Sequence, residues 1–210
     1  MILHRDCIFY KYSGTPNWGE VEEKENGKFC SFSCESYQDN VLKVNLTWLD
    51  PIKVRDKIIT TERKSIFFFV FESNKTICIF GSSESQIAYT ISKLLEFFSI
   101  NFKKINLFDK YKDQFLESTN YNGLILTSFD IAKQQYGFDD NTYINISLEE
   151  IRTNELLDYI NSYSVISFVT LFEEKKLYFS LDLYSVISFF DTDEPYSIYC
   201  ACERIVKDIV

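Results

Sequence analysis

The stretch from Ser65 to Phe98, SIFFFVFESNKTICIFGSSESQIAYTISKLLEFF, decides the fold. It begins with two short apolar runs, Ser65–Phe71 and Thr76–Phe80, which are rich in β-branched and aromatic residues and are separated by four polar residues. Such runs around a polar turn predict a β-hairpin. Ser83 and Gln86 then stand at capping-box spacing, and apolar residues recur at helical spacing as far as Phe98. The stretch therefore predicts a β-β-α unit.

A second unit with the same order of elements is predicted near the C-terminus. Val165–Phe172 and Leu177–Leu183 are predicted strands, and Val186–Phe190 either extends the second strand or forms a third. Carboxylates and a proline at 191–195 are typical of a helix start. Because the two units share an order of elements without clear residue identity, a duplicated half-domain stays an open alternative.

The other elements are shorter, and several boundaries are predicted from single residues. Val41–Leu49 is a predicted strand that Asp50-Pro51 ends, and Phe129–Tyr136 is a predicted short helix. Ser147 and Glu150 predict the start of another helix. Hairpins mixed with helices indicate an α+β fold with a mostly antiparallel sheet and packed helices. Without a Pro- or Gly-rich linker after residue 28, we expect one domain over 1–210, and halves at 1–120 and 121–210 are the alternative.

The charge of the chain is unevenly distributed. The formal net charge is −9, and residues 138–210 carry 5 Lys and Arg against 14 Asp and Glu, whereas the earlier parts are balanced. This distribution argues against nucleic acid as a partner, because phosphate binding needs clustered Lys and Arg. It favours a basic protein partner, with association that is faster at low salt. The alternative is that the carboxylates only keep a Phe-rich chain soluble.

The cysteine content and the hydropathy of the chain indicate in which cellular compartment the protein works. The N-terminus lacks the apolar run of a secretory signal, and the longest uncharged stretch, 159–172, is shorter than the roughly 18 residues of a membrane-spanning helix. We therefore expect a cytoplasmic protein without a membrane segment, in which six cysteines are reduced thiols.

Two groups of residues carry side chains that can bind metals, and neither forms a complete site. His4, Cys7, Cys30 and Cys34 resemble two zinc knuckles in spacing, but the second pair is C-x3-C rather than C-x2-C and no Gly turns either pair. The carboxylates considered for a metal-dependent enzyme belong to a predicted turn and a predicted helix start: Glu173, Glu174, Asp191 and Asp193. We expect neither a bound metal nor a cofactor, and we regard enzymatic activity as the less favoured reading. The aromatic pair Phe189-Phe190 is predicted to pack in the core.

The function that the sequence favours is non-enzymatic binding. We expect an acidic interaction protein, of an inhibitor or immunity type, that docks on a basic protein through its C-terminal third. The carboxylates expected to bind the partner are Asp182, Asp191, Asp193 and Glu194, with Asp139 and Asp140 as a second patch. A subunit or adaptor of a larger assembly is the first alternative, and a metal-dependent enzyme that uses carboxylates is the second.

Overall fold

The computed structural model describes residues 5–18, 30–54, 57–132, 143–162 and 164–209. The chain divides into two compact units: unit 1 comprises 1–105 and 206–210, and unit 2 comprises 106–205. This boundary precedes the predicted half-chain boundary at residue 120, because the helix that follows Asn106 packs within unit 2. Each unit combines an antiparallel sheet with helices, which confirms the α+β class.

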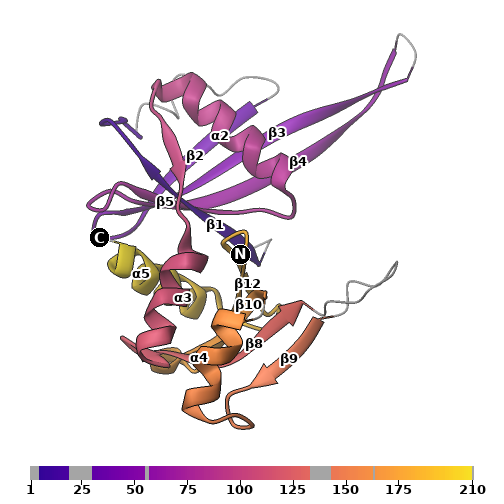
Figure 1. Cartoon of the computed structure of the whole chain (residues 1–210). Helices are drawn as coiled ribbons and strands as arrows, with labels where there is room; N and C mark the ends of the chain where they lie inside the picture. The colour runs from indigo at the N-terminus through magenta and orange to yellow at the C-terminus, as the bar shows by residue number, and fades with distance from the viewer. Residues whose placement is uncertain (1–4, 19–29, 55–56, 133–142, 163, 210) are drawn as a thin grey trace. The chain divides into compact units, whose positions relative to one another are not determined.

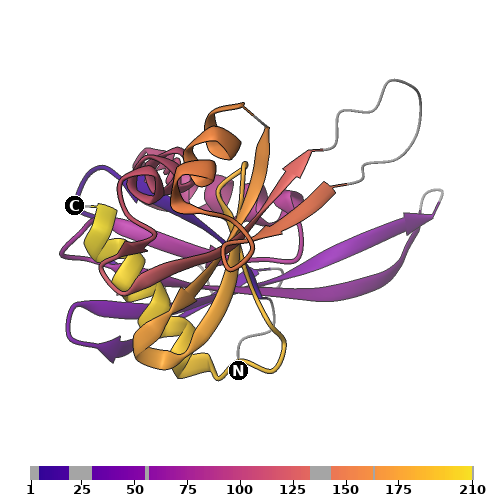
Figure 2. The same ribbon diagram turned by 60° about the horizontal axis from the view of Figure 1, so that its bottom comes forward.

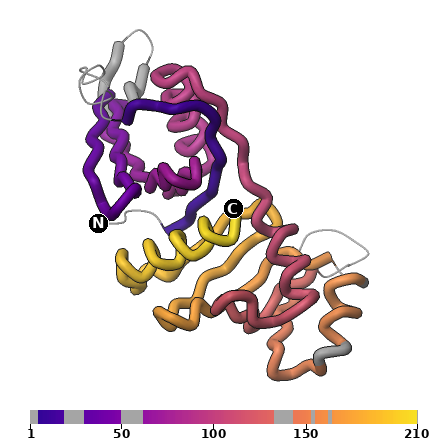
Figure 3. Tube along the Cα trace, turned by 90° about the vertical axis from the view of Figure 1, so that its left-hand side faces the viewer, coloured from indigo at the N-terminus to yellow at the C-terminus, as the bar shows by residue number. Residues whose placement is uncertain are grey.

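Unit 1 is an antiparallel sheet with one long helix. Its elements are β1 (Asp6–Tyr12), β2 (Cys30–Gln38), β3 (Val41–Val54), β4 (Lys57–Phe71), β5 (Thr76–Phe80), α2 (Glu84–Phe98) and β6 (Phe102–Lys104). The strand order is β2-β3-β4-β5-β1-β6, and every pair is antiparallel. Figure 1 shows α2 lying across the sheet, and Figure 3 shows that the sheet curves strongly.

The predicted β-β-α unit is confirmed by β4, β5 and α2. Phe71 pairs with Thr76 across the turn, and all five residues of β5 are buried. The Ser83 side chain accepts a hydrogen bond from the Gln86 amide, as the capping spacing predicted. The Gln86 side chain in turn accepts one from the backbone of Ser82, one residue before the cap. The helix packs through aromatic contacts such as Trp48 with Tyr89, whose ring centroids are 4.8 Å apart.

The prediction that Asp50-Pro51 ends β3 is wrong. The strand continues to Val54, and Pro51 pairs with Thr61 of β4. Among the described residues, β2 pairs with β3 only as far as Trp48, so the rest of β3 has β4 as its one neighbour. Proline is tolerated in edge strands, because one side of such a strand needs no N–H donors for a neighbouring strand. Figures 1 and 2 show β3 and β4 running on together as a long two-stranded ribbon.

Unit 2 likewise combines antiparallel sheet with helices. Its elements are α3 (Leu107–Glu117), β7 (Asn120–Tyr121), β8 (Leu124–Ala132), β9 (Tyr143–Ser147), α4 (Thr153–Ser162), β10 (Val165–Phe172), the 3-10 turn η1 (Glu173–Lys175), β11 (Leu177–Asp182), β12 (Val186–Phe189) and α5 (Pro195–Ile209). The strand order is β12-β11-β10-β8, and both β7 and β9 pair with β8. Of the two alternatives predicted for this segment, residues 186–189 form a third strand. The last residues of α5, from Val206 on, belong to unit 1.

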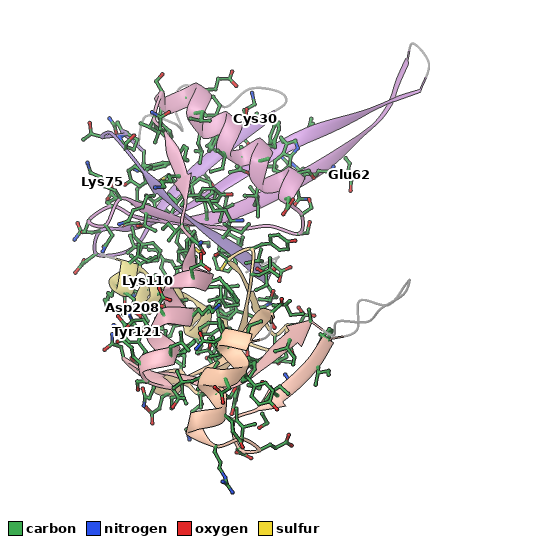
Figure 4. The ribbon with its side chains drawn as sticks, in the orientation of Figure 1. Cys30, Glu62, Lys75, Lys110, Tyr121 and Asp208 are labelled. Carbon is green, nitrogen blue, oxygen red and sulfur yellow. The ribbon has the colours of Figure 1, made fainter. Side chains whose placement is uncertain are left out.

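Helices α3 and α4 cover the buried face of this sheet. Phe168 of β10 is fully buried, and its ring centroid lies 4.8 Å from that of Phe108 and 5.7 Å from that of Phe115. On α4, Tyr159 contacts Phe129 of β8. Figure 4 shows Tyr121 of β7 beside α3, where it contacts Tyr111. The core of unit 2 is therefore largely aromatic.

The predicted helix over 129–136 is wrong, because β8 is a strand as far as Ala132, and the remainder of that prediction lies outside the described residues. A β-bulge explains the error. Leu126 pairs with Thr170 and Ser128 with Val169, which leaves Thr127 as an extra residue. The bulge shifts the buried positions of the strand from 124 and 126 to 129 and 131. The sequence consequently lacks the simple alternation of a strand.

The predicted helix start at Ser147 is also wrong. Ser147 is the last residue of β9, and its hydroxyl accepts a hydrogen bond from the Glu149 amide within a turn. The helix begins at Thr153, where the Glu155 carboxylate accepts a 2.9 Å hydrogen bond from the Arg152 amide. In the described part of the chain, no helix combines the length and the apolar character needed to cross a membrane.

Candidate functional site

Two connections of unit 2 meet at one end of its sheet. The η1 turn joins β10 to β11, and residues 190–194 join β12 to α5. Since Phe179 pairs with Phe189 in an antiparallel ladder, the start of β11 lies beside the end of β12. The Lys175 ammonium lies 5.3 Å from the centroid of the Tyr196 ring, which links the two connections directly.

Most of the exposed side chains at this end are acidic or aromatic, and Lys176 is exposed beside them. We call the acidic and aromatic ones the docking surface, defined by Glu173, Glu174, Phe190, Asp191, Glu194 and Tyr196, all of which are exposed. Phe190 is 61% exposed and Tyr196 is 50% exposed, which is high for such large rings. Apolar rings among carboxylates at a sheet end are typical of a surface that a partner covers.

Two lysines, Lys175 in the η1 turn and Lys176 directly after it, lie beside this group. Lys175 is 3.4 Å from the Glu174 carboxylate and also approaches the face of the Tyr196 ring. The hydrogen bond to Glu174 raises the pKa of Lys175 above its usual value, with a smaller contribution from Cys200. Lys175 thus contacts both an acidic and an aromatic member of the group.

The predicted carboxylates divide into two kinds. The Asp182 carboxylate accepts backbone hydrogen bonds from Tyr184 at 2.9 Å and Val186 at 2.8 Å, and so shapes the β11–β12 turn. The Asp193 carboxylate accepts one from the Phe190 amide at 2.8 Å. These carboxylates are at least partly occupied by their own backbone, as is typical of Asp in turns. Asp191 and Glu194 are exposed members of the docking surface.

The register separates Asp182 from the docking surface. Asp182 lies three residues beyond Phe179 in one direction, and Asp191 lies two residues beyond Phe189 in the other. At about 3.3 Å per residue the two are roughly 16 Å apart along the strands. The four carboxylates predicted from the last third therefore do not form one cluster. Asp139 and Asp140 lie outside the described residues.

The structure also places the cysteines considered for zinc. His4 lies outside the described residues. Cys30 and Cys34 are four residues apart on β2, which is about 13 Å in a strand, whereas the sulfurs of two zinc ligands lie within about 5 Å. Cys7 is on β1, separated from β2 by three strands of the sheet. Figure 4 shows Cys30 near α2.

A fully buried neighbour of Cys7 is Cys78 on β5, with the two sulfurs within 4.8 Å. Sequence spacing gives no signal for this proximity, because it depends on the pairing of β1 with β5. The carboxylates considered for an enzyme are also not gathered for a metal. Within the described ranges, Glu173, Glu174, Asp191 and Asp193 do not bring three carboxylates together at one point.

The exposure of Phe190 was not predicted. Sequence reasoning placed both Phe189 and Phe190 in the core, whereas only Phe189 is buried. Successive residues of a strand face opposite sides, so one exposed ring was foreseeable in principle. The signal for Tyr196 was the predicted helix start, whose first turn is exposed.

Comparison with known proteins adds no assignment. No protein-family model matches the chain, and no curated protein matches its sequence.

Proposed function

We propose that the protein is a non-enzymatic binding module that docks on a basic protein through the docking surface of unit 2. The observation that carries this proposal is the exposure of Phe190 and Tyr196 next to Asp191 and Glu194. Buried aromatic anchors supply much of the affinity of protein interfaces, and surrounding charges select and steer the partner.

The distribution of exposed apolar side chains supports unit 2 as the binding unit. Among the described residues the exposed large hydrophobic side chains in unit 2 are Tyr143, Ile144, Leu157, Tyr178, Leu183, Tyr184, Phe190 and Tyr196. In unit 1 the corresponding side chain is Leu95 of α2. Exposed apolar area concentrated on one unit indicates where association would remove it from water.

The acidic charge supports a basic partner. Carboxylates near Phe190 would attract Lys and Arg side chains and would repel phosphate groups, which is the action expected of an inhibitor or immunity-type protein that masks a basic surface. The proposal therefore includes no nucleic acid partner.

A charge-reversal pair tests the proposal against the general effect of net charge. The test variant is Asp191→Lys with Glu194→Lys, and the control is Asp113→Lys with Glu117→Lys, exposed positions of α3. Both pairs change the net charge equally. Each protein is used as bait in a lysate of the native cell at low and high salt, and association rates are then measured with the purified captured protein.

We expect a basic protein to be captured by the wild type and by the control but not by the test variant. At low salt the association rate of the test variant should fall about tenfold, and the difference should shrink as salt screens the charges. Equal loss in both variants would show that only net charge matters. An unchanged rate in the test variant would overturn the proposal.

A specific observation favours the adaptor reading as the second candidate. Tyr143 and Ile144 on β9 are 63% and 42% exposed, and β9 pairs with β8 alone among the described strands. An exposed apolar strand at a sheet edge is a natural place for a further strand. If Tyr143→Ser with Ile144→Ser abolishes capture while the charge variants do not, the protein is an assembly subunit that binds through β9.

A further inference from the structure

Unit 2 also contains a pocket of about 520 Å³ on the sheet face opposite α3 and α4. Ligand pockets are commonly about 300–1,000 Å³ in volume, so its size suits a small molecule. Its polar and aromatic lining includes Thr127, Ser128, Asn145, Ser147, Glu149 and Tyr178. None of these belongs to the docking surface.

The β-bulge at Thr127 forms the base of the pocket. One end of β8 pairs with β7, where Asn120 lies opposite Ile125, and the other end pairs with β9, where Ser128 lies opposite Ser147. Between these partners the bulge turns the Thr127 hydroxyl to the backbone carbonyl of Val169, to which it donates at 3.0 Å. Bulges often redirect side chains at binding sites.

The side chains around the bulge offer fixed hydrogen-bonding groups. The Asn145 amide nitrogen donates to the Ser128 hydroxyl at 3.3 Å and to the Asp130 carboxylate at 2.8 Å. Both of its protons are thereby directed into the protein, so the Asn145 carbonyl oxygen is the group that a ligand hydroxyl would meet. The exposed carboxylate of Glu149 adds a second acceptor.

An aromatic ring forms the opposite wall. Tyr178 is 44% exposed and lies across Leu171 from Ile125, on the same face of the sheet as the pocket. The described lining contains no Lys, Arg or His, and it includes Glu149, so an anionic ligand is disfavoured. Polar groups of both hydrogen-bonding roles beside one aromatic face match a ligand that is rich in hydroxyls and has an apolar C–H face.

We propose that this pocket binds a neutral sugar unit, with its ring against Tyr178 and its hydroxyls bound by Asn145, Glu149 and the serine hydroxyls. A single sugar ring in an open pocket is expected to bind with a dissociation constant of about 1 mM. The site is independent of the docking surface, so a negative result for either leaves the other unaffected.

The experiment titrates glucose, galactose, mannose and N-acetylglucosamine, with glucose 6-phosphate as the charged counterpart, and follows the backbone amide signals by NMR. At least one neutral sugar should shift the signals of residues 126–128 and 145–149. Tyr178→Ala and Asn145→Ala should each weaken that binding about tenfold, and glucose 6-phosphate should bind more weakly than glucose.

The matched control is Tyr184→Ala, which removes another exposed tyrosine, outside the pocket, and should leave binding unchanged. The amide spectrum of each variant reports its fold, and because Tyr178 and Asn145 are both exposed, a fold change in one leaves the other as the test. The proposal is overturned if no sugar of the panel shifts the pocket signals. It is equally overturned if both folded variants bind like the wild type, or if the phosphate ester binds more tightly.

Discussion

Asp182→Ala should open the β11–β12 turn and loosen the start of α3. The carboxylate accepts the amides of Tyr184 and Val186 and thereby holds Ser185 at a φ of 57°. The buried Ser185 hydroxyl accepts a 3.1 Å hydrogen bond from the Phe108 amide in the first turn of α3. One side chain thus connects a surface turn to the helix that covers Phe168.

The expected size follows from the two hydrogen bonds. Bonds to a charged acceptor contribute about 1.5–3 kcal/mol each when they are buried. Asp182 is half-exposed, so water competes and about 1 kcal/mol each is the better value, or about 2 kcal/mol in total. A loss of that size raises the population of the opened turn roughly 30-fold. Asp182→Asn keeps a side-chain oxygen as acceptor and should lose about half as much.

Amide hydrogen exchange measures the effect at the two donors themselves. Protection of the Tyr184 and Val186 amides should fall in Asp182→Ala, followed by that of Phe108, and should fall less in Asp182→Asn. Asp113→Ala, an exposed position of α3, is the control and should change none of these amides. Equal losses of protection in the Ala and Asn variants would refute this explanation, because the effect would then come from charge. Unchanged protection in the Ala variant would refute it as well.

Two further predictions concern the core and the alkaline limit of stability. Phe168→Ala should lower the free energy of unfolding by about 3–5 kcal/mol, because the Phe168 ring is fully buried. The same change at the exposed Phe190 should lower it by less than about 0.5 kcal/mol. Similar losses for the two variants in urea titrations would contradict the burial assigned to these rings. Burial raises the pKa of Tyr12 above its ordinary value of 10.0, with Trp18 partly offsetting the shift. The unfolded chain therefore ionises first, and tryptophan fluorescence in urea should show unit 1 losing stability as the pH rises through about 10, less so in Tyr12→Phe.

Patterns among residues close in sequence predicted the central strands and the helix of unit 1, but they did not predict where all of its strands end. β4, β5 and α2 follow from residues close in sequence: two apolar runs, a polar turn and the cap at Ser83. The length of β3 does not, because Pro51 is accommodated by the pairing of β3 with β4, and that depends on which strands are neighbours. The bulge at Thr127 misled the interpretation of β8 for a similar reason, since it exists only against β10.

The sequence predicted which types of residue form the candidate site, but the structure corrected where these residues lie. The sequence alone determined that the last third is acidic, that strands and a helix follow one another there, and that apolar side chains are plentiful. It did not determine that Asp182 lies at the opposite end of the sheet from Asp191, or that Phe190 is exposed while Phe189 is buried. Those facts depend on strand register, because a shift of one residue turns every side chain to the other face. Register is set by contacts between residues far apart in the chain, and only the tertiary structure contains them.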